Sequence, residues 1–125
     1  MVVDKIDKPK DICQRTFEFS VRVLQVCQFL YKKGGPERRL ADQLLRAGTS
    51  IGANIEEARA GQSRPDFISK NAIALKEARE TNYWIRLLVA AQLVPESQLS
   101  ALEAESAELM KIIGAIVVSS RQAKR

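Results

Sequence analysis

Four glutamates in the middle of the chain carry the side chains best suited to metal chemistry. Glu56 and Glu57 are adjacent, and Glu77 and Glu80 lie one helical turn apart. Helical bundles that bind two metal ions combine inward-facing glutamates with Glu-x-x-His pairs, and this chain contains no histidine. On helical geometry Glu56 points away from the expected core and Glu57 flanks it, while Glu77 and Glu80 lie nearer a second face. We therefore expect surface and interface ion pairs instead of a metal site, with the partners Lys76, Arg79 or Arg86.

The sequence offers no activated nucleophile. Because the chain has no histidine, Ser50, Ser63 and Cys27 lack the general base that usually activates such nucleophiles. Cys13 and Cys27 fall within one expected helix and would be about 21 Å apart, too far for a disulfide, so we expect buried thiols in a reducing cytoplasm. The segment "GTSIG" lacks the Gly-Lys-Ser/Thr ending of a phosphate loop. We expect no catalytic residue, no metal and no cofactor, and keep a carboxylate-dependent metal or nucleotide hydrolase as a remote alternative.

Basic side chains form two groups that suit nucleic acid. The chain has a net charge of +5, and a basic surface attracts polyanions. The same charge also serves simply to keep a small domain soluble, and no recognised base-reading motif occurs. The candidate nucleic-acid contacts lie around "KKGGPE", one to two turns further on, and in the C-terminal tail: Lys32, Lys33, Arg38, Arg39, Arg46, Arg121, Lys124 and Arg125.

Hydrophobic periodicity places these residues on four helices, at roughly 9–33, 36–60, 64–92 and 95–120. Pro9 suits a first helical turn with Asp7 as N-cap, and Pro36 opens the second helix. Gly61 is expected to end the second helix, and Ser63 to cap the third. Short connections between such helices predict one all-α domain over residues 1–125, an antiparallel up-down-up-down four-helix bundle with frayed termini.

The chain contains no 18-residue apolar run, and its start, "MVVDKIDKPKD", lacks the apolar core of a signal peptide. We expect a soluble cytoplasmic protein with no membrane partner.

Two helices carry more apolar surface than one core can cover. In the first, Cys13, Phe17, Leu24, Cys27 and Tyr31 recur beside a second set, so the apolar arc exceeds about 200°. In the third, a second apolar line lies away from the core line of Phe67, Ala74, Ala78, Ile85 and Val89. We expect a homo-oligomer, either a two-fold dimer or a heterologous ring. Its interface candidates are Ile73, Tyr83, Trp84, Arg86, Leu87 and Ala91.

The second helix contains residues that weaken helices. Gly48 and Gly52 each cost about 0.5–1 kcal/mol relative to alanine, so a compensating contact is expected. Ala41 and Leu45 complete a stripe of mostly small residues that lets another helix backbone approach. On the other border of the core, polar side chains can bond to neighbouring helices or subunits. The predicted packing seam comprises Ala41, Leu45, Gly48, Gly52, Ser50, Asn54 and Glu57.

Residues 44–88 resemble a bacterial family of four-helix-bundle proteins, first noticed as reading frames in intervening sequences of large-subunit ribosomal RNA genes. The shared pattern is R-A-x-T-S-I-x-A-N-I-x-E, which runs here from Arg46 to Glu57, followed by Ser63 and the pair Asp66-Phe67. "ALKEARETNYWIRLL" resembles a subgroup with a Lys-Glu-Ala-x-Glu core followed by Tyr-Trp. Gly52 departs from the pattern, because many members have proline there.

The resemblance implies a four-helix protomer that assembles into a ring, a homopentamer in known members. It also implies similarity to the accessory variability determinant of diversity-generating retroelements, a basic bundle that binds a reverse transcriptase and nucleic acid. The family offers no catalytic residues. We therefore expect a non-enzymatic, ring-forming scaffold for RNA or proteins, or alternatively an adaptor for a partner protein such as a reverse transcriptase.

Overall fold

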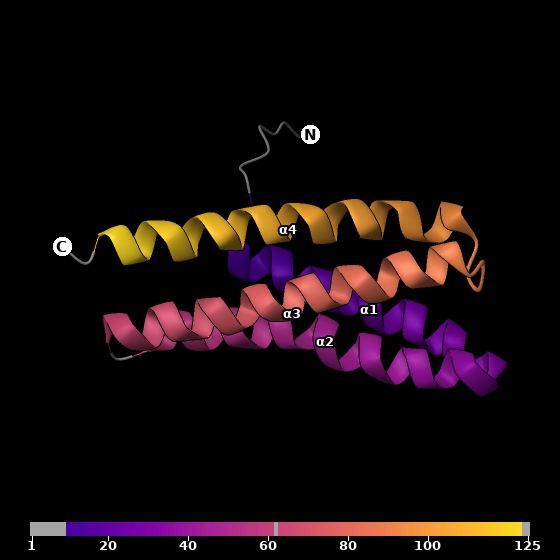
Figure 1. Cartoon of the computed structure of the whole chain (residues 1–125). Helices are drawn as coiled ribbons and strands as arrows, with labels where there is room; N and C mark the ends of the chain where they lie inside the picture. Colours follow the sequence, from indigo (N-terminus) through magenta and orange to yellow (C-terminus); the bar gives the residue numbers. More distant parts are fainter. Residues whose placement is uncertain (1–9, 62, 124–125) are drawn as a thin grey trace, which may run out of the picture.

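The computed structural model describes residues 10–61 and 63–123, which fold into four α-helices and contain no strand (Figure 1). The helices are α1 (Ile12–Lys33), α2 (Gly35–Ala60), α3 (Arg64–Ala90) and α4 (Glu96–Gln122). Consecutive helices run in opposite directions, so the expected all-α bundle is confirmed for this part of the chain. None of the described helices is both long enough and apolar enough to cross a membrane.

α1 begins later than the sequence pattern suggested. Its N-cap is Asp11, whose Oδ1 accepts a hydrogen bond of 2.9 Å from the backbone N–H of Gln14. This bond satisfies one of the free donors in the first helical turn. The expected cap Asp7 and the expected first-turn Pro9 lie outside the described residues.

The joints between helices follow the glycine, serine and proline signals. Gly34 and Gly35 have φ values of 72° and 60°, in the left-handed region that favours glycine, and they turn the chain from α1 into α2. Gly61 ends α2, and its N–H bonds to the carbonyl of Ala58 at 3.2 Å. Ser63 caps α3 as predicted, because its Oγ accepts a hydrogen bond of 3.2 Å from the N–H of Asp66.

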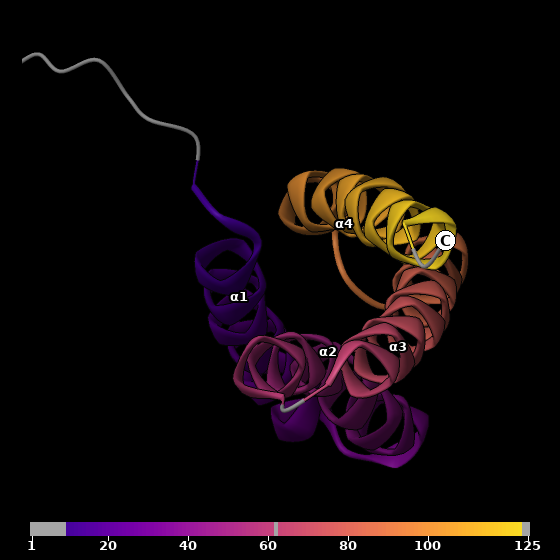
Figure 2. The same ribbon diagram turned by 90° about the vertical axis from the view of Figure 1, so that its left-hand side faces the viewer.

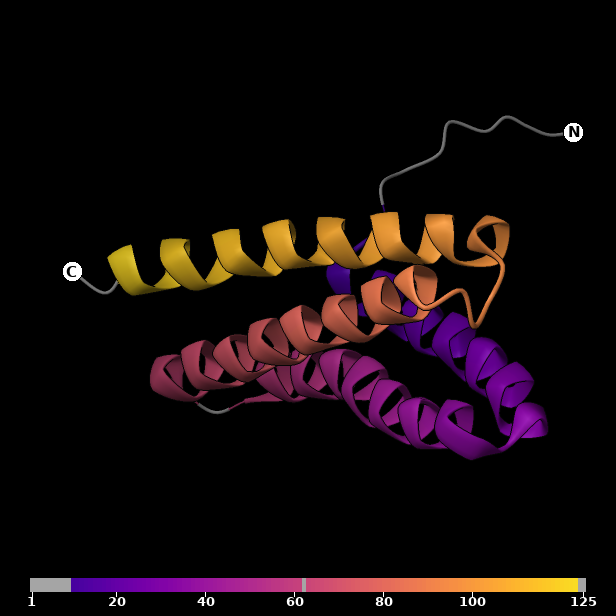
Figure 3. The ribbon, with the colours of Figure 1, turned by 45° about the vertical axis from the view of Figure 1, so that its right-hand side comes forward.

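Each helix packs along its neighbour in sequence, but the first and last helices of the bundle are in much less contact with each other. α2 lies between α1 and α3, and α3 lies between α2 and α4 (Figure 2). α1 and α4 meet only over a short stretch. As Figure 3 also shows, the C-terminal half of α4 runs along α3 and away from α1. The bundle therefore has one weakly sealed side, between its first and last helices.

The core is built from one stripe of each helix. On α1 the buried residues are Thr16, Phe19, Val23, Cys27 and Leu30. Phe17 and Leu24, which belong to the wide apolar arc seen in the sequence, are 62% and 46% exposed. Because the apolar arc of this helix is so wide, periodicity alone could not identify which edge of it faces inward. In α3 the expected core residues Ala74, Ala78 and Ile85 are buried, whereas Phe67 and Val89 are half-buried.

The two interior glycines of α2 lie directly against α1. A Cβ atom added to Gly48 would come within 2.9 Å of both γ-methyl groups of Val23. A Cβ added to Gly52 would come within 3.2 Å of the backbone carbonyl oxygen of Thr16. Both contacts are tighter than ordinary van der Waals packing, so the absent side chains allow the two helices to approach closely.

Candidate nucleic-acid interface

Four cations gather where α1 passes into α2. Lys32 and Lys33 end α1, and Arg38 and Arg39 lie in the first turns of α2. All four are exposed. We call this group the basic corner. It lies at the same end of the bundle as the connection between α3 and α4, and Lys33 lines a surface cavity there together with Val94 and Pro95.

The cations of the basic corner are available to a polyanion. Within residues 10–61 and 63–123, none of the four forms an ion pair with a carboxylate. Two of them lie over aromatic rings: the Lys33 Nζ is 5.0 Å from the centre of Phe29, and the Arg38 Cζ is 5.7 Å from the centre of Tyr31. Such contacts orient a cation without neutralising it.

Asp42, a carboxylate on the same helix as Arg38 and Arg39, is hydrogen-bonded to Tyr31. The hydroxyl of Tyr31 donates a hydrogen bond of 2.5 Å to the Oδ1 of Asp42. This bond, helped by partial desolvation, raises the pKa of Tyr31 to about 12, so the phenol stays neutral and holds the carboxylate. Asp42 therefore contacts Tyr31 and not the guanidinium groups of the basic corner.

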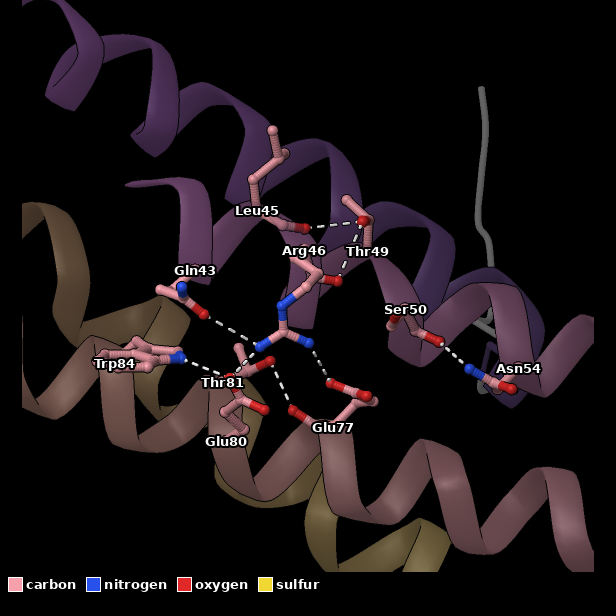
Figure 4. Close-up of polar contacts among 10 residues, drawn as sticks. All are labelled: Gln43, Leu45, Arg46, Thr49, Ser50, Asn54, Glu77, Glu80, Thr81 and Trp84. Atoms are coloured by element: carbon pink, nitrogen blue, oxygen red, sulfur yellow. Dashed lines mark hydrogen bonds and ion pairs between the residues drawn. The ribbon is translucent and has the colours of Figure 1, made fainter. Parts of the chain in front are cut away.

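Arg46, one of the candidate nucleic-acid residues, has a different environment. Its guanidinium pairs with Glu77 at 3.3 Å and with Glu80, and both carboxylates belong to α3 (Figure 4). A further bond of 3.3 Å runs to the side-chain oxygen of Gln43. Arg46 thus joins α2 to α3, and its charge is compensated within the protein.

This network also changes the expected roles of the α3 glutamates and of Trp84. The sequence suggested that Glu77 lies near an outer face and pairs with a cation of its own helix; in the structure it is only 9% exposed and pairs with Arg46. The Trp84 indole N–H donates a 3.0 Å hydrogen bond to Glu80, and the ring packs against the core. Sequence reasoning missed these contacts because Arg46 and Glu77 are 31 residues apart and no local spacing links them.

The remaining basic candidates lie far from the basic corner. Arg121 is exposed near the end of α4, at the opposite end of the bundle. Lys124 and Arg125 lie outside the described residues.

Large apolar side chains are exposed on α1 and on α3, and Val118 is exposed on α4. On α3, Ile73 and Tyr83 are 38% and 48% exposed. Of the other interface candidates, Arg86 and Ala91 are exposed, whereas Trp84 and Leu87 are half-buried. A second surface lies on α1, on the helix whose wide apolar arc led the sequence analysis to expect a further contact. We call it the α1 stripe; it comprises Phe17, Val21 and Leu24, which are 62%, 42% and 46% exposed.

Two polar members of the predicted seam, Asn54 and Glu57, form bonds within the chain. The Asn54 side chain donates a hydrogen bond of 2.9 Å to the carbonyl of Ser50 in its own helix. Glu57 pairs with Lys70 of α3 at 2.9 Å. Ala41 is buried, and Leu45 and Ser50 are half-buried.

The four glutamates considered for metal chemistry do not share one site. Glu77 and Glu80 meet at Arg46, Glu57 meets Lys70, and Glu56 is exposed. In the described ranges no three His, Cys, Asp or Glu side chains gather in a way that could hold a metal ion.

Comparison with known proteins places the chain in a family. The family model described as "23S rRNA-intervening sequence protein" matches residues 8–115. A solved structure of a protein with unknown function from the S23 ribosomal protein family, from Bacteroides thetaiotaomicron, is similar over 86% of this chain and 98% of its own. The two share 40% sequence identity, with a TM-score of 0.79. No curated protein matches the chain.

Proposed function

Because this chain belongs to the 23S rRNA-intervening sequence protein family, we propose that it is a non-enzymatic helical scaffold that binds RNA through the basic corner. The observation that carries the proposal is the group of four exposed cations without a carboxylate partner in the described part of the chain. Lysine and arginine side chains in this state bind phosphates and release the counterions that surround them.

The aromatic rings of the basic corner support RNA in particular. Phe29 and Tyr31 underlie Lys33 and Arg38, and unpaired bases stack on aromatic rings and on guanidinium planes. A single-stranded RNA can present phosphates and unstacked bases to this surface together. No helix of the described chain carries a recognised base-reading motif, so we expect modest sequence preference.

Assembly into a ring is the second part of the proposal, with five copies as the family resemblance implies. α1 and α3 both carry exposed apolar side chains, and these two helices are separated by α2. Contact between two different surfaces joins copies head to tail, and repetition of such a contact closes a ring when the rotation allows it. A ring presents the basic corner several times and raises affinity through multivalency.

The test is the affinity of the full chain for a labelled single-stranded RNA at low salt. The corner variant carries glutamine at Lys32, Lys33, Arg38 and Arg39, and we expect its affinity to fall at least tenfold. The matched control carries glutamine at Arg64, Lys76, Arg79 and Lys111, which removes the same charge from α3 and α4. Equal losses of RNA affinity in the two variants would show that net charge, and not the position of the basic corner, determines binding. Undetectable binding by the natural chain would refute the proposal.

A further inference from the structure

We propose that two copies of this chain meet head to tail, with Phe17 of one copy seated in a hollow between α3 and α4 of the next. The hollow is open to solvent and has a volume of about 340 Å³. We call it the α3–α4 hollow. The inference rests on the self-assembly proposed above and names the two surfaces that meet in it.

The α1 stripe is the projecting surface of the contact. Phe17 is 62% exposed, more than any other large apolar side chain among the described residues. Val21 and Leu24 follow it at helical spacing, so the three side chains lie on one face of α1 over about 10 Å. Large apolar side chains that lie together on a surface favour an interaction site.

The α3–α4 hollow can receive an aromatic ring. Leu75 of α3 and Met110 of α4 line it, and both are half-buried. Ala107 and Gly114 of α4 also line the hollow. These two residues are small, and a Cβ added to Gly114 would still lie 4.0 Å from the nearest atom of Leu75. Because an apolar cavity of about 150 Å³ already holds a benzene ring, the hollow has room for the side chain of Phe17.

The charges beside the two surfaces are complementary. Glu56 lines a cavity together with Phe17, is exposed, and forms no ion pair within residues 10–61 and 63–123. Arg79 and Lys111 line the α3–α4 hollow and are exposed. In the same ranges Arg79 has no carboxylate partner, and Lys111 pairs with Glu108 of its own helix at 3.8 Å. Seating Phe17 in the hollow therefore brings a free carboxylate to two cations.

The same charges favour a head-to-tail contact over a two-fold one. If two α3–α4 hollows faced each other, Arg79 and Lys111 would meet the same cations of the second copy. Tyr83, the exposed aromatic residue of α3, has the guanidinium of Arg86 5.8 Å from its ring centre and would add a further cation. α1 lies on the side of the bundle opposite α3 (Figure 2). Each copy can therefore offer the α1 stripe to one neighbour and the hollow to another.

Charge reversal tests the contact, with the mass of the full chain measured by light scattering at micromolar concentrations. Glu56→Arg, and separately Arg79→Glu with Lys111→Glu, place like charges in the contact. Each should shift the mass from a multiple of 14.0 kDa toward the single chain. All three substitutions in one chain restore opposite charges and should recover the natural mass. Glu96→Arg, at an exposed position of α4, makes the same charge change as Glu56→Arg and should leave the mass unchanged.

A photoreactive residue at position 17 tests where the α1 stripe lies. The chain with benzoylphenylalanine in place of Phe17 is mixed with isotopically heavy natural chain and irradiated. We expect cross-links from position 17 to peptides of the other copy that contain Leu75 or Met110.

The α3–α4 control of the RNA experiment should stay assembled. Glutamine at Arg79 and Lys111 removes the two positive charges without adding repulsion, so the α1 stripe can still enter the hollow. Exposed ion pairs contribute little to stability. The mass of this control is measured alongside that of the natural chain.

The outcomes separate this contact from self-assembly itself. A natural chain that stays single would refute the proposed assembly and the contact with it. A natural oligomer whose mass survives both charge reversals, or is not recovered when they are combined, would overturn the contact alone. Cross-links to other surfaces would do the same. Loss of the expected cross-links when RNA is added would assign the hollow to RNA and would also overturn the contact.

Discussion

Arg46 of α2 supplies the cation that pairs with two carboxylates of α3. Glu77 is nearly buried, and Arg46 reaches it from the neighbouring helix, together with Glu80. A carboxylate in this position is costly without a cation, because it has lost much of its hydration. Arg46 therefore contributes to stability mainly by allowing the Glu77 carboxylate to be buried.

Replacing Arg46 by methionine should lower the free energy of unfolding by about 1–2 kcal/mol, since the substitution leaves Glu77 without its cation. Adding Glu77→Gln should recover part of the loss, because the neutral amide needs no cation. Arg39→Met, which removes an unpaired exposed cation, is the control and should change stability by less than about 0.5 kcal/mol. Urea denaturation measures all four proteins. A loss in the double variant as large as in Arg46→Met would contradict the assignment.

Asp11 makes the start of α1 sensitive to acid. The backbone N–H of Gln14, with Arg59 as a further contributor, holds the pKa of Asp11 below its ordinary value of 3.8. A carboxyl group with a lowered pKa stabilises the folded state above its ordinary pKa, and this contribution disappears as the pH falls through the folded value. The natural chain should therefore lose stability below about pH 4 partly through this residue.

Asp11→Asn tests this effect, because asparagine caps helices as well as aspartate does but does not titrate. We expect near-natural stability at pH 7 and a smaller loss between pH 5 and pH 2, measured by thermal unfolding at each pH. Asp11→Ala should be destabilised already at pH 7. If Asp11→Asn showed the same pH dependence as the natural chain, the acid sensitivity would have to come from other groups.

At the scale of the helices, the glycines of α2 set the distance to α1. A methyl group at Gly48 would meet the stiff γ-methyl groups of Val23, and one at Gly52 would meet backbone. Glycine weakens a helix, so the close approach of α1 and α2 has to compensate for that cost. The approach also brings the α1 stripe and the basic corner into the positions described above.

Gly48→Ala should therefore destabilise the protein by about 1–3 kcal/mol despite the better helix propensity of alanine. Val23→Ala will also destabilise it, but the two changes together should cost less than their sum, because the smaller side chain makes room for the new methyl group. Gly114→Ala is the matched control on α4. Its added Cβ would lie 4.0 Å from the nearest atom of Leu75, so we expect stabilisation of about 0.5–1 kcal/mol. Additive costs at positions 23 and 48 would contradict the steric explanation.

The ends and the inward faces of the helices differed in how far the sequence could predict them. Ser63 and Gly61 are strong local signals, and both occupy the positions that were expected. The start of α1 was placed too early, because Pro9 and Asp7 also resemble a helix start and only the structure shows that Asp11 is the cap. The inward edge of α1 and the pairing of Arg46 depend on how distant segments pack, so neither could be derived from spacing.

The whole molecule presents two kinds of surface on different helices. Apolar side chains are exposed on α1 and α3, while unpaired cations gather at the basic corner. Large exposed apolar side chains that lie together mark interaction sites. Self-association and RNA binding can therefore occur together on one scaffold.

Substitution in the α1 stripe should break the proposed ring. Phe17→Glu and Leu24→Glu place a charge in the apolar contact, so light scattering should show a shift from a multiple of the 14.0 kDa chain toward the single chain. Ser97→Glu, at another exposed position, is the control and should leave the mass unchanged. A natural chain that stays monomeric across micromolar concentrations would contradict ring assembly.

The salt dependence of RNA affinity tests the central proposal most directly. Each phosphate contact by a cation contributes about 0.7 to the slope of log affinity against log salt for single-stranded RNA. Removing the four cations of the basic corner should therefore reduce the magnitude of the slope by about 2 to 3 per protomer engaged, while the matched α3–α4 control keeps a slope close to that of the natural chain. An unchanged slope in the corner variant, together with a reduced slope in the control, would show that RNA binds elsewhere.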